Sequence, residues 1–493
     1  MGIGALTALF IYVATADRLV LTIDEGTFLS SGVNVLHGAV PYRDFFANTG
    51  PGDFWLLALI FRFAGISLRS AHSLVALDCG LIIGLTGWLT ARFAGRRAAL
   101  AWPVLCLALF LSSPTYLVTN HRWDANALAL GAMAACLLAI ESNSRSAAFL
   151  AGLLGVLAAW VTPPVGLLAA VVAFRLLLDR KTWTLVPRHL AGAALGTVAP
   201  AAWLASQGGL GPMFDSLWWN ASHYSGANLV PYGFLMGGPA ALFGGAHGIE
   251  WVARILFAFA FLLPAILPLA AGLAWLPALR DPRRPEAFLL LCGIALVASN
   301  YPRCDLTHLV YVCPVFLVLG AAWLQRHVSG LACVVAFLVP FLPALAMSRQ
   351  NLAGAEQTVV ATSVGSIRIS QEDAPSLGLA VRHVRAGDSL FVFPYEPIFY
   401  FVTQGRNPTG YPWLQPGMMS DQDERAALAE LSADPPKWIL YRALPAEAYL
   451  RVWPGADPAR LRMPLIEEFI RGRYVDYAAA SSGDGERRLL VRR

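Results

Sequence analysis

Two adjacent carboxylates, Asp24 and Glu25, directly follow an apolar run at the beginning of the chain. A carboxylate in that position can take a proton from a hydroxyl or an amine, so either residue can serve as a general base. Asp24 also precedes a stretch with helical spacing, and an N-cap Asp stabilises a helix by about 1 kcal/mol. The two interpretations are compatible, because one residue can cap the helix while its neighbour accepts the proton.

A second polar cluster, "HRWD", contains His121, Arg122 and Asp124. The planar guanidinium of an arginine forms paired hydrogen bonds with phosphate oxygens, so Arg122 is a candidate phosphate ligand. Asp124 can neutralise Arg122, hold a metal ion or bind acceptor hydroxyls. The alternative is a local Arg–Asp pair that caps the following helix.

A third cluster, "YPRCDLTH", contains Arg303, Asp305 and His308. Arg303 and His308 offer further cationic groups for a phosphate ester or diphosphate. A plain polar loop is the alternative, since an arginine near a membrane surface often binds only lipid headgroups.

Two smaller features remain open from the sequence. Tyr42, Arg43 and Asp44 either bind substrate or only close their loop. Trp218 and Trp219 suit an aromatic belt at a membrane interface or stacking against a sugar.

The elements that must position these residues are mostly apolar. Of 493 residues, 57% are hydrophobic and 14% are charged, against about 25% charged in soluble domains. With a mean hydropathy of +0.57, the chain has the composition of a multi-span membrane protein. The acids divide it in two, because 14 of the 31 lie in residues 1–349 and the other 17 in the shorter segment 350–493. We expect a membrane domain, 1–349, followed by a water-soluble domain, 350–493.

Apolar runs predict about eleven spans, several of them short enough to be halves of broken helices. The runs are 2–20, 70–93, 98–113, 125–141, 146–161, 163–178, 190–206, 251–275, 287–300, 309–325 and 330–347. The first run could be a cleaved secretory signal, but no Lys or Arg precedes it and many spans follow.

The distribution of basic residues predicts the orientation of the spans. With the N-terminus in the cytoplasm, the inner loops collect most of the loop arginines, as the positive-inside rule requires. The outer loops are then 21–69, 114–124, 207–250 and 299–308. All three polar clusters fall in these outer loops, so we expect a site at the outer face of the membrane.

The first outer loop has two amphipathic stretches. In residues 27–37 the apolar positions follow a helical spacing, and Gly38 suits the position after a helix end. "PGDFWLLALIFRFAG" (51–65) is interpreted as a second interfacial helix, because counting it as a span would reverse every later loop.

The C-terminal segment alternates between helix and strand patterns. Helices are expected at 376–386, 423–433 and 463–474, and strands at 389–394, 437–442 and 487–493. This alternation predicts a small α/β domain. It contains neither a G-x-G-x-x-G motif nor a P-loop, so nucleotide binding is not supported.

Other functional classes lack their signatures. The seven cysteines lie within or beside apolar runs, with no disulfide framework or zinc spacing. The net charge of +5 comes from loop arginines and forms no nucleic-acid patch.

The sequence resembles the membrane-embedded GT-C glycosyltransferases. The resemblance is carried by "IDEG" after the first apolar run, "LHGAVPYRDFF", "GPGDFWLLALIFRFAG", Arg-x-Asp at 122–124 and "YPRCDLTHL". The nearest branch is that of the dolichyl-phosphate-mannose–protein mannosyltransferases and bacterial aminoarabinose transferases. In layout the resemblance covers residues 1–350.

The resemblance implies a mainly α, polytopic helix bundle and a polyprenyl-phosphate-linked sugar as donor. It implies Asp24 as the base of an inverting displacement and a glycan, lipid or protein acceptor. Arg122, Arg303 and His308 are then available to the leaving phosphate. It implies no firm cofactor and leaves a divalent metal open. With the high Ala, Arg and Leu content, it also implies a bacterial inner membrane and a periplasmic C-terminal domain.

Two other classes remain as alternatives. A transporter or lipid flippase also places polar residues between spans, but usually near the midplane and with internal repeats, neither of which is evident here. A non-catalytic partner in envelope synthesis is the third class.

Overall fold

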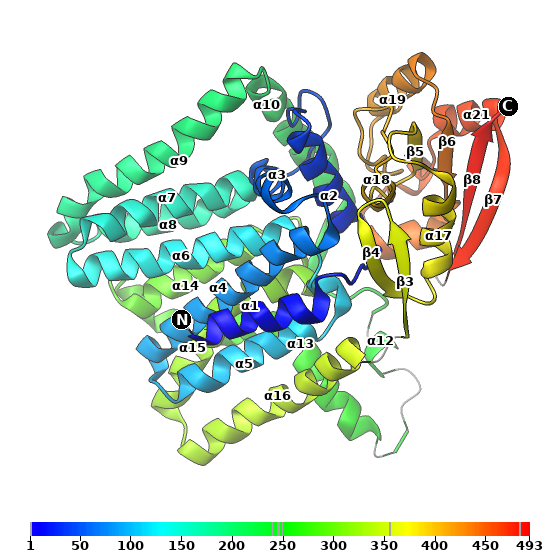
Figure 1. Cartoon of the computed structure of the whole chain (residues 1–493). Coiled ribbons are helices and arrows are strands. Elements are labelled where there is room, and N and C mark those ends of the chain that lie inside the picture. Colours follow the sequence, from blue (N-terminus) through cyan, green and yellow to red (C-terminus); the bar gives the residue numbers. More distant parts are fainter. Residues whose placement is uncertain (1, 239, 244–246, 249, 354–355, 483–484) are drawn as a thin grey trace.

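The computed structural model describes residues 2–238, 240–243, 247–248, 250–353, 356–482 and 485–493. A bundle of long helices runs along one direction, and the sheet-containing C-terminal part lies at one end of it (Figure 1). Helices α2, α3 and α10 lie at that same end.

Every apolar run predicted from the sequence coincides with a helix. The eleven helices are α1 (Gly2–Thr15), α4 (Leu68–Ala94), α5 (Ala98–Leu111), α6 (His121–Ser142), α7 (Arg145–Val161), α8 (Gly166–Leu177), α9 (Val186–Ser206), α13 (Glu250–Trp275), α14 (Pro285–Ala298), α15 (Leu306–His327) and α16 (Gly330–Ala353). Within the described residues, five segments are long and apolar enough to cross a membrane: α4, α6, α13 with its 3₁₀ extension, α15 and α16. These helices support a membrane location, while the number of eleven spans stays a prediction.

The first predicted outer loop folds as two helices, α2 (Ile23–Leu36) and α3 (Gly52–Ala64). The N-cap of α2 is Thr22, whose hydroxyl accepts a hydrogen bond from the Glu25 amide, so the N-cap interpretation of Asp24 is wrong. Gly38 follows the helix end with a φ of +95°, as its sequence position predicted.

Two predicted outer segments are joined by a short parallel ribbon. Strand β1 (Val230–Phe234) belongs to segment 207–250 and pairs with β2 (Arg303–Asp305) of segment 299–308. Because β2 ends directly at the start of α15, this pairing fixes the polar residues at the head of that helix. The shorter helices around these segments are η1 (Pro114–Tyr116), η2 (Pro163–Val165), η3 (Arg180–Leu185), α10 (Leu210–Trp219), η4 (Asn220–Tyr224), α11 (Ser225–Ala227), α12 (Ala240–Phe243) and η5 (Leu276–Arg280).

The C-terminal part contains a four-stranded mixed sheet with the order β5-β6-β8-β7. Its elements are β3 (Gln357–Thr362), β4 (Gly365–Ser370), α17 (Ala374–His383), β5 (Leu390–Phe393), α18 (Ile398–Thr403), α19 (Asp421–Ala433), β6 (Trp438–Tyr441), α20 (Ala446–Val452), η6 (Pro458–Arg460), α21 (Pro464–Arg473), β7 (Tyr474–Ser482) and β8 (Gly485–Arg492). The three helices and three strands predicted for this segment are all present. The β3–β4 hairpin, α18, α20 and β7 were not predicted.

The C-terminal part shares a hydrophobic core with α2, α3 and α4. Gly26 on α2 allows the closest approach, because a Cβ atom there would lie 2.1 Å from the backbone nitrogen of Ile398 on α18. Beside it, the rings of Phe61 and Phe401 stack with centroids 6.1 Å apart. The helix that carries Asp24 is therefore held between the bundle and α18.

Candidate active site

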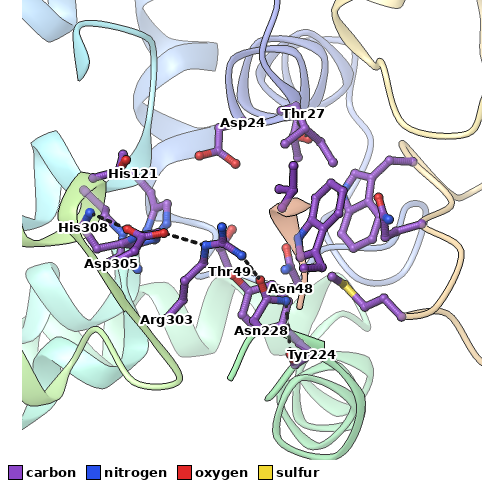
Figure 2. Close-up of a pocket in the computed structure, with 18 of the residues that line it drawn as sticks. Asp24, Thr27, Asn48, Thr49, His121, Tyr224, Asn228, Arg303, Asp305 and His308 are labelled. Carbon is purple, nitrogen blue, oxygen red and sulfur yellow. Dashed lines mark hydrogen bonds and ion pairs between the residues drawn. The ribbon is translucent and has the colours of Figure 1, made fainter. Parts of the chain in front are cut away.

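A cavity of about 230 Å³ lies where α2, the heads of α6 and α15, and the C-terminal part meet. All four predicted outer segments contribute to its lining, with Asp24, Arg122, Tyr224 and the pair Arg303 and His308. Figure 2 shows Asp24 and Arg303 facing the cavity from opposite walls, with His308 and Asp305 beside Arg303.

Asp24 lies in the first turn of α2 and is open to the cavity. The side-chain amide of Asn120 donates a hydrogen bond to its Oδ2 at 3.0 Å. Burial of the cavity within the protein raises the pKa of Asp24, and the neighbouring His308, Arg122 and Arg303 oppose this rise. An accessible carboxylate with a raised pKa is suited to taking up a proton.

Glu25 points away from the cavity and is fully buried. Its Oε1 lies 2.7 Å from Nε2 of His72 and accepts a hydrogen bond from the Thr119 amide at 3.1 Å. The other ring nitrogen of His72 lies 2.8 Å from the carbonyl oxygen of Thr15. Since both ring nitrogens face acceptors, His72 carries two protons when Glu25 is ionised. This buried ion pair ties α2 to α1 and α4.

The third cluster is organised by Asp305, the N-cap of α15. Its Oδ2 accepts from Nε of Arg303 at 2.8 Å, and its Oδ1 accepts from Nδ1 of His308 at 2.6 Å. Burial raises the pKa of Asp305, but His308 and Arg303 outweigh it, so the net pKa lies well below the ordinary value. Asp305 thus remains ionised and orients two groups toward the cavity.

Both oriented groups keep hydrogen-bonding capacity for a ligand. Arg303 also donates from Nη1 to the side chain of Asn228 at 3.1 Å (Figure 2). In the described part of the chain, Nη2 of Arg303 and Nε2 of His308 make no hydrogen bond. Because Nδ1 of His308 donates to Asp305, Nε2 becomes a donor only in the protonated ring.

Arg122 and His121 also line the cavity. Arg122 donates from Nη1 to the side chain of Asn300, and its Nε is buried with no partner among the described residues. Nδ1 of His121 lies 2.6 Å from the hydroxyl of Thr162. The N-cap of α6 is Asn120, so the predicted alternative of an Arg122–Asp124 capping pair is wrong.

Asp124 does not line the cavity. It lies in the first turn of α6 and is buried, with its carboxyl group close to those of Asp53 on α3 and Asp78 on α4. Burial, followed by the contact with Asp124, raises the pKa of Asp53 well above its ordinary value. Carboxyl groups this close must share protons, because like charges in a buried site cannot all persist.

Tyr42, Arg43 and Asp44 lie outside the cavity and close their loop. Tyr42 is at a φ of +69° and donates from its hydroxyl to the Thr49 carbonyl at 2.5 Å. Arg43 pairs with Asp44 at 2.7 Å and donates to the carbonyl of Gln207 after α9. Of the two candidate interpretations, these contacts support loop closure.

Trp218 and Trp219 have different surroundings. Trp218 is exposed. Trp219 packs edge-on against Phe46 and donates from its indole N–H to Asp423 on α19 at 3.2 Å. Neither residue lines the cavity, and Trp219 instead joins α10 to the C-terminal part.

A second cavity, of about 340 Å³, adjoins the first. The two share Asn48, Thr49, His121, Arg122 and Tyr224 in their linings. The rest of the second cavity is mainly apolar or small, with Pro163, Pro164, Leu217, Ala221, Tyr301 and Pro302 among its residues. Arg122 therefore lies between a polar cavity and a more apolar one.

Several lining residues were not predicted from the sequence. Asn48, Asn228 and Tyr224 are single polar residues without a recognisable motif, and only the fold brings them to the cavity. The wall formed by the C-terminal part was missed as well. Its members are Trp413, Gln415, Met418, Val452 and Trp453.

A divalent metal was left open by the sequence. Across the residues that the structure describes, no three His, Cys, Asp or Glu side chains are grouped so that they can hold an ion.

Comparison with known proteins gives matches among solved structures only. No protein-family model and no curated protein sequence matches the chain. ArnT from Cupriavidus metallidurans bound to undecaprenyl phosphate matches with a TM-score of 0.58 and 15% identity, covering 99% of this chain and 97% of ArnT. The archaeal oligosaccharyltransferase AglB from Archaeoglobus fulgidus, in complex with an inhibitory peptide and a dolichol-phosphate, matches with a TM-score of 0.53 and 12% identity. That alignment covers 99% of this chain and 74% of AglB.

A second structure of the Archaeoglobus oligosaccharyltransferase, in complex with Zn and sulfate, has a TM-score of 0.50 and 12% identity. At these identities the matches establish the fold. The chain shares the fold of ArnT and AglB over almost its whole length, in agreement with the fold that the sequence resemblance implied.

Proposed function

We propose that the protein is an integral-membrane glycosyltransferase that moves a sugar from a polyprenyl-phosphate carrier to an acceptor on the periplasmic face of a bacterial inner membrane. One observation carries the proposal: an accessible carboxylate, Asp24, faces two arginines, Arg122 and Arg303, and the imidazole of His308 across one cavity. The fold supports it, because the ArnT structure with this fold contains undecaprenyl phosphate and an AglB structure contains a dolichol-phosphate.

The reaction is an inverting displacement. The Asp24 carboxylate takes the proton of an acceptor hydroxyl or amine, and the freed lone pair attacks the anomeric carbon. The bond from that carbon to the phosphate oxygen breaks, and its electron pair stays with the lipid phosphate. Arg303 and Arg122 stabilise the charge that develops there, and His308 adds a hydrogen bond when its ring is protonated.

The two adjoining cavities suggest how the polyprenyl-phosphate carrier is oriented when it binds. With its phosphate at Arg122, the polyprenyl chain extends into the second, more apolar cavity, and the sugar enters the first cavity beside Asp24. This orientation puts the anomeric carbon between the base and the cations, as an inverting displacement requires.

The Asp24→Asn variant tests the proposal. Cells lacking the gene are complemented with wild type, Asp24→Asn or Asp215→Asn, and envelope lipids and glycans are compared by mass spectrometry. Asp215 is an exposed acid on α10 and serves as the matched control. We expect one glycosylated product that requires the gene, persists with Asp215→Asn and falls at least about a hundredfold with Asp24→Asn.

Two results would contradict the proposal. Product formation by Asp24→Asn at the wild-type rate would remove Asp24 as the base. In proteoliposomes, movement of a labelled lipid-linked sugar across the bilayer without a covalent product would instead favour a transporter or flippase.

A further inference from the structure

The wall of the cavity supplied by the C-terminal part is the feature that the proposed reaction does not explain. It consists of Trp413, Gln415 and Met418, from the irregular segment between α18 and α19, and of Val452 and Trp453 at the end of α20. All but Val452 are buried. Two indole rings and a buried amide are an unusual lining for a cavity whose other groups bind phosphate.

The amide of Gln415 has an unused acceptor. The residue is 1% exposed, and its Nε2 donates to the carbonyl of Pro416 at 3.2 Å. Since a carbonyl only accepts, this bond determines which end of the amide is the oxygen. Within the described residues, Oε1 has no partner. A buried acceptor without a partner is unfavourable, and a ligand hydroxyl that entered the cavity could satisfy it.

Asn48 adds a second amide to the lining of the first cavity (Figure 2). The same residue also lines the second cavity. Its backbone carbonyl accepts from Asn220, whereas its side chain makes no hydrogen bond among the described residues. The side chain is partly accessible. It therefore offers a donor and an acceptor to whatever lies beside Arg303.

Aromatic rings combined with amide groups match the chemistry of a sugar, which has C–H faces for packing and hydroxyls for hydrogen bonds. The sugar of the donor is joined to the phosphate through one oxygen, so it must lie close to the cations. A volume of about 230 Å³ suits one sugar ring rather than a chain of sugars.

We propose that the C-terminal wall, together with Asn48, is the subsite that reads a single monosaccharide on the lipid carrier. The ring packs against Trp413 and Trp453, and hydroxyl groups bind the amides of Gln415 and Asn48. This inference rests on the proposed function and assigns its donor specificity to a segment outside the membrane helices.

Binding measurements on the purified full-length protein separate the inference from the function on which it rests. The probes are undecaprenyl phosphate alone and undecaprenyl phosphate carrying glucose, galactose, mannose or arabinose. The readout is the ratio of the affinity for each glycosylated lipid to that for the bare lipid. We expect at least one ratio above about ten in the wild type.

Gln415→Leu and Asn48→Ala should bring that ratio close to one. Asn34→Ala, an exposed residue on α2, is the matched control and should keep it. Binding of the bare lipid by Gln415→Leu also reports that this variant is folded.

Each outcome decides a different point. If the wild type fails to bind undecaprenyl phosphate, the proposed function is wrong. If it binds the bare lipid but gains nothing from any of the four sugars, the sugar subsite is wrong while the function stands. A gain that survives both Gln415→Leu and Asn48→Ala also overturns the subsite.

Discussion

Asp24 and Glu25 are neighbours in the chain, yet the helix they share gives them different environments. Successive residues on an α-helix point in directions about 100° apart, because 3.6 residues make one turn. Asp24 consequently faces the cavity, while Glu25 faces the bundle and pairs with His72. Both residues are candidates for the base from the sequence, and the helix geometry turns only Asp24 toward the cavity.

The pH dependence of transfer should follow the environment of Asp24. Only the ionised carboxylate accepts a proton, and burial raises its pKa above the ordinary value of 3.8. We therefore expect kcat/KM to fall as the pH drops through a midpoint above that value. Arg303→Gln removes a cation that favours the ionised form and should move the midpoint to higher pH.

The matched control for this shift is Arg96→Gln, an exposed residue between α4 and α5. It should leave the midpoint unchanged. A midpoint that stays constant or moves to lower pH in Arg303→Gln would contradict the assignment of the acidic limb to Asp24.

The buried pair of Glu25 and His72 should affect the free energy of unfolding more than the rate of transfer. Removing one partner leaves a buried charge, so His72→Ala and Glu25→Ala should each lower the free energy of unfolding by about 3–5 kcal/mol. Glu25→Gln removes the charge but keeps the shape of the side chain, at the loss of one hydrogen bond of the neutral His72 ring, and should retain most of the transfer activity. Denaturant unfolding in detergent measures the change in stability, and the product assay measures the transfer activity. Loss of transfer in a folded Glu25→Gln protein would contradict a purely structural role of Glu25.

At the scale of secondary structure, the sequence predicted those elements that a local pattern of residues determines. The eleven apolar runs became helices because a backbone in an apolar environment must satisfy its hydrogen bonds within the segment. The N-cap of α2 was predicted two residues too late, since Thr22 and Asp24 are both good caps. The β1–β2 ribbon was missed because strands of five and three residues leave no periodic signal.

Contacts between segments that are distant in the chain could not be predicted from the sequence, for a different reason. The pairing of Asp124 with Asp53 and Asp78 joins three helices, and no pattern on any one of them indicates it. The same holds for Gln415 and Trp453, whose importance appears only once the C-terminal part packs over α2.

The contact of α2 with α18 gives a prediction for Gly26. A methyl group at Gly26 must displace the backbone of Ile398, so Gly26→Ala should lower the free energy of unfolding by about 1–3 kcal/mol and reduce transfer. Gly272→Ala is the control, because nothing lies within 4 Å of a Cβ at that position on α13, and it should cause no loss of stability. Equal stability of Gly26→Ala and Gly272→Ala would contradict the close packing of α18 against α2.

At the scale of the whole molecule, the helix bundle and the C-terminal part form one folded unit. The shared core joins Phe28, Leu29 and Phe54 to Ile398 and Phe399 across their boundary. Polar contacts reinforce it, since Arg368 on β4 pairs with Asp17 after α1. The division at residue 349, predicted from the distribution of acids, remains a change in composition and a proposal for a domain boundary.

Removal of the C-terminal part tests whether the helix bundle folds without it. A chain ending at residue 353 would expose the apolar faces of α2 and α3 and lose one wall of the cavity. We expect it to aggregate in detergent and to bind no undecaprenyl phosphate, as measured by size-exclusion chromatography and a binding assay. The full-length protein prepared in parallel is the control, and a monodisperse truncated protein that binds the lipid would contradict the prediction.

The close packing of Gly26 on α2 against Ile398 on α18 also has a consequence for folding during protein synthesis. The ribosome delivers Asp24 well before α18 and the segment with Gln415, which both follow it in the chain. Until then, helix α2 has no partner on one side and the sugar subsite has no wall. Under the proposed function, a nascent chain would therefore stay inactive toward lipid-linked sugars until the segment with Gln415 has been made and has packed over α2.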